Sequence, residues 1–329
     1  MTVATLPRLG FLGVGWIGRN RMEALVREDL AQVAAVADPQ PEALKAVAAL
    51  APRAERADGL EALLEHELDG IVIATPSALH TRQTTAALEH EVAVFCQKPL
   101  ARDAEETRQV LEAARRNDRL LGVDLSYRHV EALRAAQTAV SDGEIGLLHS
   151  LDLTFHNAYG PDKAWLTKPE LSGGGCLIDL GTHLLDLALR LTGASEYEVE
   201  TARMLSLQGH EVEDNATAEI SLGTDEVRAR LACSWFQSAG SECAFECTAW
   251  GTDGAVSIRN VGGSSYDLRA ELWRGTSAEL LAGPADPRGG RAIGSWATRL
   301  AGDRGYDPAA DELELLARVI DDVYAEAGR

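Results

Sequence analysis

The stretch GFLGVGWIG, residues 10–18, decides the fold of this chain. An apolar run ends there in three glycines, Gly13, Gly15 and Gly18, which follow the pattern G-x-G-x-x-G. In a strand–turn–helix unit the first glycine permits a tight turn, the second lets a pyrophosphate approach the backbone, and the third lets the helix pack closely on the strand. The stretch therefore predicts the phosphate-binding turn of a dinucleotide-binding domain.

Asp38 supports this interpretation, because it ends a second apolar run 20 residues after Gly18. A carboxylate at that spacing accepts a hydrogen bond from an adenosine ribose hydroxyl. It would repel the 2′-phosphate of NADP, and residues 39–41, PQP, supply no arginine to offset that repulsion. NAD is therefore favoured over NADP. A turn-forming Asp-Pro is the alternative interpretation of Asp38.

Further cofactor contacts are expected from the glycine turn and from later strand ends. Beside the three glycines and Asp38 this set comprises Trp16, Ile17, Thr75, Pro76, Ser77, His80, Gln97 and Lys98. His80 falls in the first turn of a helix, where a hydrogen bond that fixes the loop is as consistent with its position as catalysis.

The 329 residues exceed what one hydrophobic core usually serves, so we expect two domains. Residues 8–124 alternate short apolar runs with amphipathic segments, which is typical of parallel strands joined by crossover helices. We expect strands at 8–13, 32–37, 70–74, 92–96 and 120–123, and helices at 41–50, 77–89 and 104–116. Residues 1–125 are thus predicted to form an α/β Rossmann domain with a doubly wound parallel sheet, whose ligands lie at the carboxyl ends of its strands.

Beyond residue 125 the pattern changes. A helix is expected near 130–141, and runs such as LHSLDLTFHN alternate apolar and polar residues, which predicts antiparallel strands with one buried face. Residues 126–329 are therefore predicted to form an α+β domain with an open, mostly antiparallel sheet. Residues 275–307 are rich in Gly, Pro and Arg and are expected to be loop, followed by a terminal helix from 308 to about 327 that is a candidate to pack back on the first domain.

Composition excludes several classes of function. The 31 basic and 51 acidic side chains give a net charge of −20, which disfavours nucleic acid and anionic membranes as partners. Five cysteines without a C-x-x-C pair favour a reducing cytoplasm over a disulfide framework. The histidines form no H-x-H or H-E-x-x-H pattern, so no metal site is expected and a metal-dependent hydrolase has little support.

Two stretches carry candidate catalytic residues. In FCQKPL, residues 95–100, Lys98 closes a predicted strand at the ligand-binding edge, and the following proline restricts its backbone. An exposed lysine in a turn is the alternative. In GGGCLIDLGTHLLDLALRLTG, residues 173–193, a helix is expected from near Gly175 to Gly193, with Asp179 and His183 on one face.

The three glycines before that helix are expected to leave space above its start, and Asp179 to orient the imidazole of His183. We expect His183 to take the hydroxyl proton of an alcohol and Lys98 to stabilise the charge that develops on the oxygen, at a nicotinamide ring. On the same helix, Asp186 and Arg190 are interpreted as a solvated ion pair four residues apart.

The order of the motifs GVGWIG, AVADP, ATPSALH, FCQKPL, YRH and GGGCLIDLGTHLLD resembles the Gfo/Idh/MocA oxidoreductase family, named for glucose-fructose oxidoreductase, inositol dehydrogenase and rhizopine catabolism. The lysine of the family's E-K-P motif corresponds to Lys98, and its catalytic Asp and His correspond to Asp179 and His183. Gln97 departs from the family pattern, because it replaces the usual glutamate and removes a charge beside Lys98.

The resemblance implies an NAD-dependent dehydrogenase or reductase acting on a secondary hydroxyl or ketone of a sugar or polyol. It also implies that residues 126–329 bind substrate and form a homodimer or homotetramer through their sheet. The implied substrate-binding set is Lys98, Arg128, Asn157, Trp165, Asp179 and His183. Arg128 could instead be a salt-bridged structural residue, and Trp165 or Trp235 could stack on a sugar ring or simply pack. A sugar sensor that keeps the cofactor without turnover is the alternative function.

Overall fold

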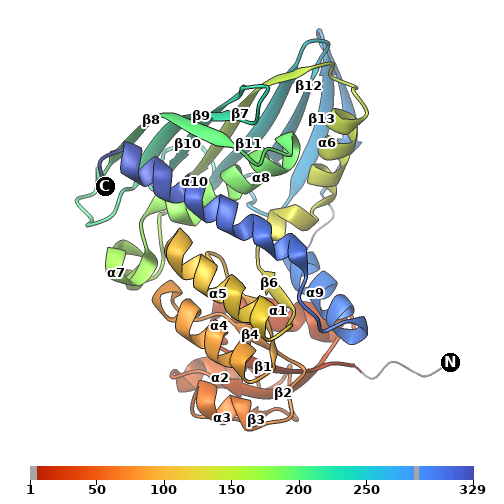
Figure 1. Ribbon diagram of the computed structural model, residues 1–329, viewed down its shortest axis with the longest axis vertical. Helices are drawn as coiled ribbons and strands as arrows, with labels where there is room; N and C mark the ends of the chain where they lie inside the picture. The colour runs from red at the N-terminus through yellow and green to blue at the C-terminus, as the bar shows by residue number, and fades with distance from the viewer. Residues whose placement is uncertain (1–5, 285–288) are drawn as a thin grey trace, which may run out of the picture. The chain divides into compact units, whose positions relative to one another are not determined.

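The computed structural model describes residues 6–284 and 289–329 (Figure 1). The chain divides into two units, which are described separately. The first comprises residues up to Asp124 together with Gly290–Leu313, and the second comprises Leu125–Gly289 and Glu314–Arg329. The two units thus divide at residue 124, and the predicted domains 1–125 and 126–329 stay a prediction.

The first unit is built on a six-stranded sheet in the order β3-β2-β1-β4-β5-β6, with all neighbouring strands parallel. Its strands are β1 (Arg8–Leu12), β2 (Gln32–Ala37), β3 (Glu55–Arg56), β4 (Gly70–Ile73), β5 (Ala93–Cys96) and β6 (Leu121–Val123). Its helices are α1 (Trp16–Arg27), α2 (Pro41–Val47), α3 (Leu60–Leu64), α4 (His80–Glu89), α5 (Ala104–Arg116) and α9 (Gly290–Gly302). The order reverses between β1 and β4, and ligands of such sheets bind at the carboxyl ends of the strands beside that reversal. The predicted doubly wound sheet is confirmed.

Helix α9 corrects the prediction that residues 275–307 are loop. Although the segment is rich in glycine and arginine, it has an apolar face that is buried in the core of the first unit and consists of Ile293, Trp296, Ala297 and Leu300. The indole of Trp296 lies 5.6 Å from the Phe95 ring, between ring centroids. Residues 285–288 of the predicted loop lie outside the described residues.

The second unit contains an eight-stranded sheet in the order β14-β13-β12-β11-β7-β10-β9-β8. Neighbouring strands are antiparallel except β7 and β10, which are parallel. The strands are β7 (Leu148–Asn157), β8 (Tyr197–Leu205), β9 (Asn215–Leu222), β10 (Val227–Ser234), β11 (Cys243–Gly251), β12 (Ala255–Asn260), β13 (Leu268–Arg274) and β14 (Ser277–Ala282). The predicted mostly antiparallel sheet is confirmed, and β14 is a second correction to the expected loop.

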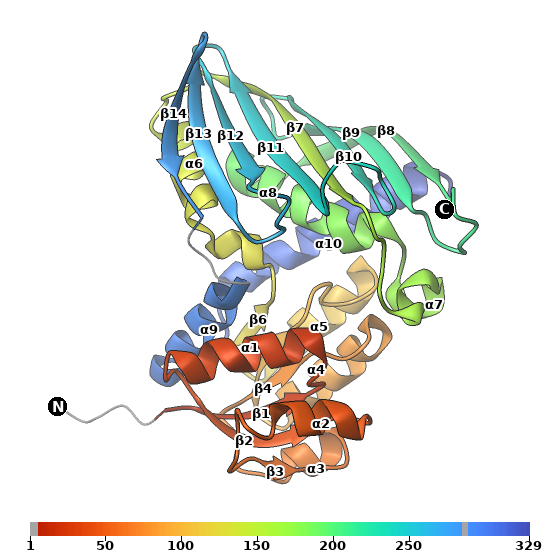
Figure 2. The ribbon, with the colours of Figure 1, turned by 180° about the vertical axis from the view of Figure 1, so that it is seen from behind.

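Helices cover one face of this sheet and leave the other open, as the two views of Figures 1 and 2 show. Helix α6 (Glu131–Ser141) contacts β12, β13 and β14, and α8 (Thr182–Thr192) contacts β7, β10 and β11. The alternation in β7 has the expected cause, because Leu151, Leu153 and Phe155 are buried whereas the side chains between them are partly exposed. The unit also contains the short helix α7 (Pro169–Ser172), a π-helical turn at Leu177–Gly181, and most of α10 (Glu312–Glu326).

The terminal helix was expected from residue 308 as a candidate to pack on the first domain. A 3₁₀ turn occupies Pro308–Asp311 and α10 begins at Glu312. Residues from Glu314 onward group with the second unit, and the packing of this helix on the first domain stays a prediction. Val319, Ile320 and Val323 of α10 are buried, and the hydroxyl of its Tyr324 donates to Glu213 of the second unit. No helix of the described residues is long and apolar enough to cross a membrane.

Candidate functional site

The glycine turn after β1 has the geometry that its sequence pattern predicts. Gly13 has a φ of +88°, and a Cβ atom there would lie 2.5 Å from the carbonyl oxygen of Ala74. A Cβ atom at Gly18 would lie 2.2 Å from the carbonyl oxygen of Gly13. At Gly15, by contrast, no heavy atom of the described residues lies within 4 Å of such an atom. The first and third glycines are thus required by the protein's own backbone, whereas the second faces open space, as expected of the glycine that a pyrophosphate approaches.

Asp38 follows β2 and is tied to the glycine turn. Its Oδ2 accepts a hydrogen bond of 2.9 Å from the amide of Val14, and its Oδ1 accepts one of 2.8 Å from the amide of Gln40. The bond to Gln40 closes the turn that the Asp-Pro sequence predicts. Each carboxylate oxygen has capacity for a further bond, so the same side chain can also accept from a ribose hydroxyl.

His80 joins two loops of the first unit. Only 1% of the residue is exposed, its Nε2 lies 2.8 Å from the carbonyl oxygen of Thr75, and its Nδ1 lies 2.8 Å from that of Pro99. Burial lowers the pKa of His80, while the two carbonyls and Glu106 oppose that shift. These contacts give His80 the loop-fixing role, and its contact with cofactor stays a prediction.

Thr75 and Ser77 lie in the same turn after β4. The Thr75 hydroxyl donates to Gln83 at 2.6 Å, and Ser77 is buried at the start of a 3₁₀ turn, Ser77–Leu79. Their cofactor contacts, like those of Trp16, Ile17 and Pro76, stay predictions.

Gln97, the residue before Lys98, belongs to a buried polar cluster. Its amide donates to Oδ2 of Asp124, the same atom that the guanidinium Nε of Arg21 approaches at 2.5 Å. The side chains of Arg21 and Asp124 are 3% and 0% exposed. A glutamate at position 97 would place a second carboxylate against Asp124, so the neutral amide suits this cluster. Sequence reasoning missed Arg21 and Asp124, although Asp124 directly follows a predicted strand at the ligand-binding edge.

In the second unit Asp179 and His183 lie on one helical segment. Asp179 lies in the π-helical turn Leu177–Gly181, and His183 lies in the first turn of α8. Single π turns occur frequently at functional sites. The indole Nε1 of Trp235 donates to Oδ2 of Asp179 at 3.0 Å. Trp235 is 3% exposed, so it packs rather than stands open to a sugar ring, and its bond to Asp179 is a contact that the sequence did not predict.

Two aromatic rings pack against His183, which is 8% exposed. The ring of Tyr127 lies 4.7 Å from the imidazole and that of Phe155 lies 6.2 Å away, between centroids. Tyr127 comes from the YRH motif, and its hydroxyl donates to the carbonyl of Ser265 at 2.7 Å. Packing against these two rings therefore restricts the orientation of the imidazole.

Arg128 and Asp186 correct one sequence prediction. Arg128 Nε lies 2.9 Å from each oxygen of Asp186, and the two side chains are 17% and 3% exposed. The interpretation of Asp186 as a solvated residue is wrong, because Asp186 is buried and bound by an arginine distant in sequence. Arg128 is salt-bridged, as its alternative interpretation expected.

The glycines before the helix correct another prediction. A Cβ atom at Gly174 would lie 2.0 Å from the Tyr324 hydroxyl, and one at Gly175 would lie 1.9 Å from the carbonyl oxygen of Glu213. These glycines do not leave open space above the helix start, because Tyr324 and Glu213 fill it.

The other residues predicted to bind substrate have structural neighbours of their own. Asn157 ends β7, and its Oδ1 accepts from the amide of Gly160 at 2.8 Å. Trp165 lies partly exposed in a 3₁₀ turn, Ala164–Thr167. Among the described residues no group of three or more His, Cys, Asp and Glu side chains could hold a metal ion.

Two family models match this chain. Residues 7–125 match one described as an oxidoreductase family with an NAD-binding Rossmann fold, and residues 133–257 match a Gfo/Idh/MocA C-terminal domain. Inositol 2-dehydrogenase of Rhizobium meliloti is 30% identical over 193 residues, which are 58% of this chain and 57% of that protein. The matches span about half to three fifths of the length of such curated relatives.

Solved structures show the same fold. KijD10, a 3-ketoreductase from Actinomadura kijaniata in complex with NADP and TDP-benzene, gives a TM-score of 0.86 at 21% identity and covers 98% of each chain. Levoglucosan dehydrogenase in complex with NADH gives a TM-score of 0.84 at 20% identity, covering 98% of this chain and 97% of that chain.

Proposed function

Because this chain belongs to the Gfo/Idh/MocA oxidoreductase family, we propose that it is an NAD-dependent oxidoreductase acting on a secondary hydroxyl or ketone of a sugar or polyol. The observation that carries the proposal is that Asp179 and His183 lie four residues apart on one helical segment, with Asp179 bound by the indole of Trp235. Lys98 follows β5 at the carboxyl edge that also carries the glycine turn.

Each residue of the proposed site has a separate role. His183 accepts the hydroxyl proton when an alcohol is oxidised and returns it when a ketone is reduced. Asp179 orients the imidazole, and Trp235 fixes Asp179. The ammonium group of Lys98 stabilises the negative charge that develops on the reacting oxygen. The bound nicotinamide supplies the hydride acceptor or donor. Asn157 and Trp165 remain candidates for holding the other hydroxyl groups and the ring of the substrate.

The preference for NAD rests on Asp38. Solved structures of this fold hold NADP or NADH, so the fold alone does not select a cofactor. The Asp38 carboxylate follows β2 and accepts from the glycine turn, where a ribose-binding acid is expected, and it would repel a 2′-phosphate. The open space at Gly15 supports pyrophosphate binding in either case.

A substrate panel tests this function. Purified protein is incubated with NAD or NADP and with inositols, aldoses, sugar acids and keto-sugars, and turnover is followed by nicotinamide absorbance. We expect turnover of at least one polyol or sugar with NAD. If NAD binds tightly and no member of the panel is turned over, the sugar-sensor function would replace the enzymatic one.

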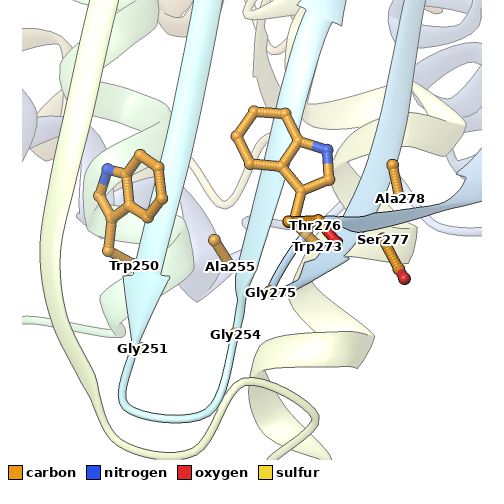
Figure 3. Close-up of a pocket in the computed structure, with 9 residues that line it drawn as sticks. All are labelled: Trp250, Gly251, Gly254, Ala255, Trp273, Gly275, Thr276, Ser277 and Ala278. Atoms are coloured by element: carbon orange, nitrogen blue, oxygen red, sulfur yellow. The ribbon is translucent and has the colours of Figure 1, made fainter.

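We propose further that the open face of the eight-stranded sheet forms a homodimer or homotetramer. Trp250 and Trp273 lie on one row across β11, β12 and β13, with ring centroids 6.0 Å apart, and line the pocket of Figure 3. The guanidinium of Arg259 lies 5.1 Å from the Trp273 ring. Leu280 of β14, 62% exposed, continues this apolar area, which a second copy would cover.

A further inference from the structure

Glu213 is a fully buried carboxyl group that the proposed chemistry does not use. Its exposure is 0%, and it lies two residues before the start of β9 at Asn215. Its Oε1 accepts hydrogen bonds from the amides of Gly175 and Leu177, each at 3.0 Å, and from the hydroxyl of Tyr324 at 2.8 Å. Its Oε2 lies 3.5 Å from a guanidinium nitrogen of Arg329. Such a concentration of donors on one buried side chain calls for an explanation.

The backbone of Glu213 also binds the start of the helical segment. Its carbonyl oxygen accepts from the amide of Cys176 at 3.0 Å. Three successive amides, those of residues 175, 176 and 177, are therefore bonded by this one residue. The first amides of a helical segment have no partner within the helix, and a carboxyl group at that end also interacts favourably with the helix dipole. Glu213 therefore caps the segment that carries Asp179 and His183.

The glycines of this segment are required by the same contacts. A side chain at Gly175 would collide with the carbonyl of Glu213, and one at Gly174 would collide with the Tyr324 hydroxyl. Burial raises the pKa of Tyr324 well above its ordinary value, so its hydroxyl stays protonated and donates. Helix α10 thereby reaches the start of the segment through Tyr324, and Arg329 adds an ion pair.

We infer that Glu213 is a positioning residue of the proposed active site, which holds the start of the Asp179–His183 segment so that the imidazole meets the reacting hydroxyl. The inference rests on the proposed function. Asp179 lies two residues beyond the last amide that Glu213 binds, and His183 one turn further on. A small displacement of such a segment can lower the rate of the chemical step about 100-fold.

The test compares three variants of the full chain. Glu213→Gln keeps the size of the side chain but replaces the oxygen facing Arg329 by an amide nitrogen. Tyr324→Phe removes a single donor. Glu211→Gln changes an exposed glutamate of the same loop and serves as the matched control. The measurements are kcat, the KM for NAD, the pH dependence of kcat, and the NMR signals of the His183 ring during a pH titration.

In Glu213→Gln we expect kcat to fall about 10- to 100-fold, with the KM for NAD little changed and with a shifted pH profile and shifted His183 ring signals. Tyr324→Phe should show the same changes at smaller size, and Glu211→Gln none. Circular dichroism checks that each variant is folded. Should Glu213→Gln not fold, Tyr324→Phe decides the question by the same readouts.

The inference is overturned if the folded variants keep the wild-type kcat, pH profile and His183 signals. Failure of the proposed function gives a different result, namely no turnover by the wild-type protein. In that case the His183 ring signals alone decide, because their shift in Glu213→Gln supports the positioning role and their constancy rejects it.

Discussion

At the residue scale, a neighbouring side chain explains why Gln97 departs from the family motif. The sequence showed only that a negative charge is missing beside Lys98. The structure adds that Gln97 donates to Asp124, which already accepts from the buried Arg21. The cluster already contains one carboxylate and one guanidinium. A second carboxylate would be unfavourable there, because two adjacent buried carboxylates repel each other. Asp124 lies 27 positions further along the chain, so this contact could not be read from the motif.

Gln97→Glu should therefore destabilise the first unit. We expect a loss of about 1–3 kcal/mol in the free energy of unfolding, because the new carboxylate faces Asp124 without a donor of its own. Urea unfolding followed by circular dichroism measures it. The double variant Gln97→Glu/Asp124→Asn restores one acid and one amide and should regain most of the loss. Equal losses in the single and the double variant would contradict the interpretation.

Asp38 carries a second prediction at this scale. Asp38→Ser keeps an oxygen that can accept from the amide of Val14 but removes the charge that opposes a 2′-phosphate. We expect the ratio of the NADP to the NAD dissociation constant to fall about tenfold or more, which corresponds to about 1.4 kcal/mol. Isothermal titration calorimetry with both nucleotides measures the ratio, and an unchanged ratio would remove Asp38 from the cofactor site.

At the element scale, sequence patterns predicted most strands and helices of the first unit, because buried parallel strands and amphipathic helices are local features. Helix α9 was not predicted, because its glycines and arginines are typical of a loop and because it is stabilised by burial of Trp296 against Phe95. The same limit applies to the segment of Asp179 and His183. The spacing of Asp179 and His183 predicted that they share a helix face. The bonds to Glu213 and Tyr324 and the Arg128–Asp186 pair could not be predicted, because they join residues distant in sequence.

Glu213 makes the stability of this segment depend on pH. Burial raises the pKa of Glu213 above its ordinary 4.5, although the Leu177 amide and the Tyr324 hydroxyl oppose the shift. Between the unfolded and the folded pKa the folded protein binds more protons, so the contribution of Glu213 to stability is present below about pH 4.5 and is lost as the pH rises through the folded pKa.

The prediction is that raising the pH above about 4.5 lowers the free energy of unfolding of the wild-type protein relative to Glu213→Gln, which lacks this titration. Each unit of pKa shift contributes about 1.4 kcal/mol. Urea unfolding at a series of pH values measures the difference between the two proteins. Parallel profiles would show that the carboxyl group titrates alike in the folded and unfolded states.

At the scale of the whole molecule, association of copies through the open sheet face is the property that the sequence predicted only through family resemblance. Alternation predicted a sheet with one buried face, but the row that joins Trp250 and Trp273 follows from strand register, which the alternation does not fix. The apolar side chains of Trp250, Trp273 and Leu280, which are partly or fully exposed on this face, are expected to contact a second copy.

Trp273→Asp should therefore shift the oligomer towards monomer. An aspartate there would lie on a desolvated surface at the contact between copies, and charges are costly to bury without a partner. Light scattering after size-exclusion chromatography measures the mass. Leu207→Asp, at a site 66% exposed in the loop between β8 and β9, is the control and should leave the mass unchanged. A monomeric wild-type protein would refute the oligomer proposal.

The most direct test of the central claim is the rate of the chemical step in Lys98→Met and His183→Asn, with the best substrate of the panel and with NAD binding measured in parallel. If Lys98 stabilises the developing oxyanion and His183 exchanges the proton, kcat should fall about 10²- to 10⁴-fold in each variant while the NAD dissociation constant stays nearly constant. Wild-type rates in both variants would contradict the account.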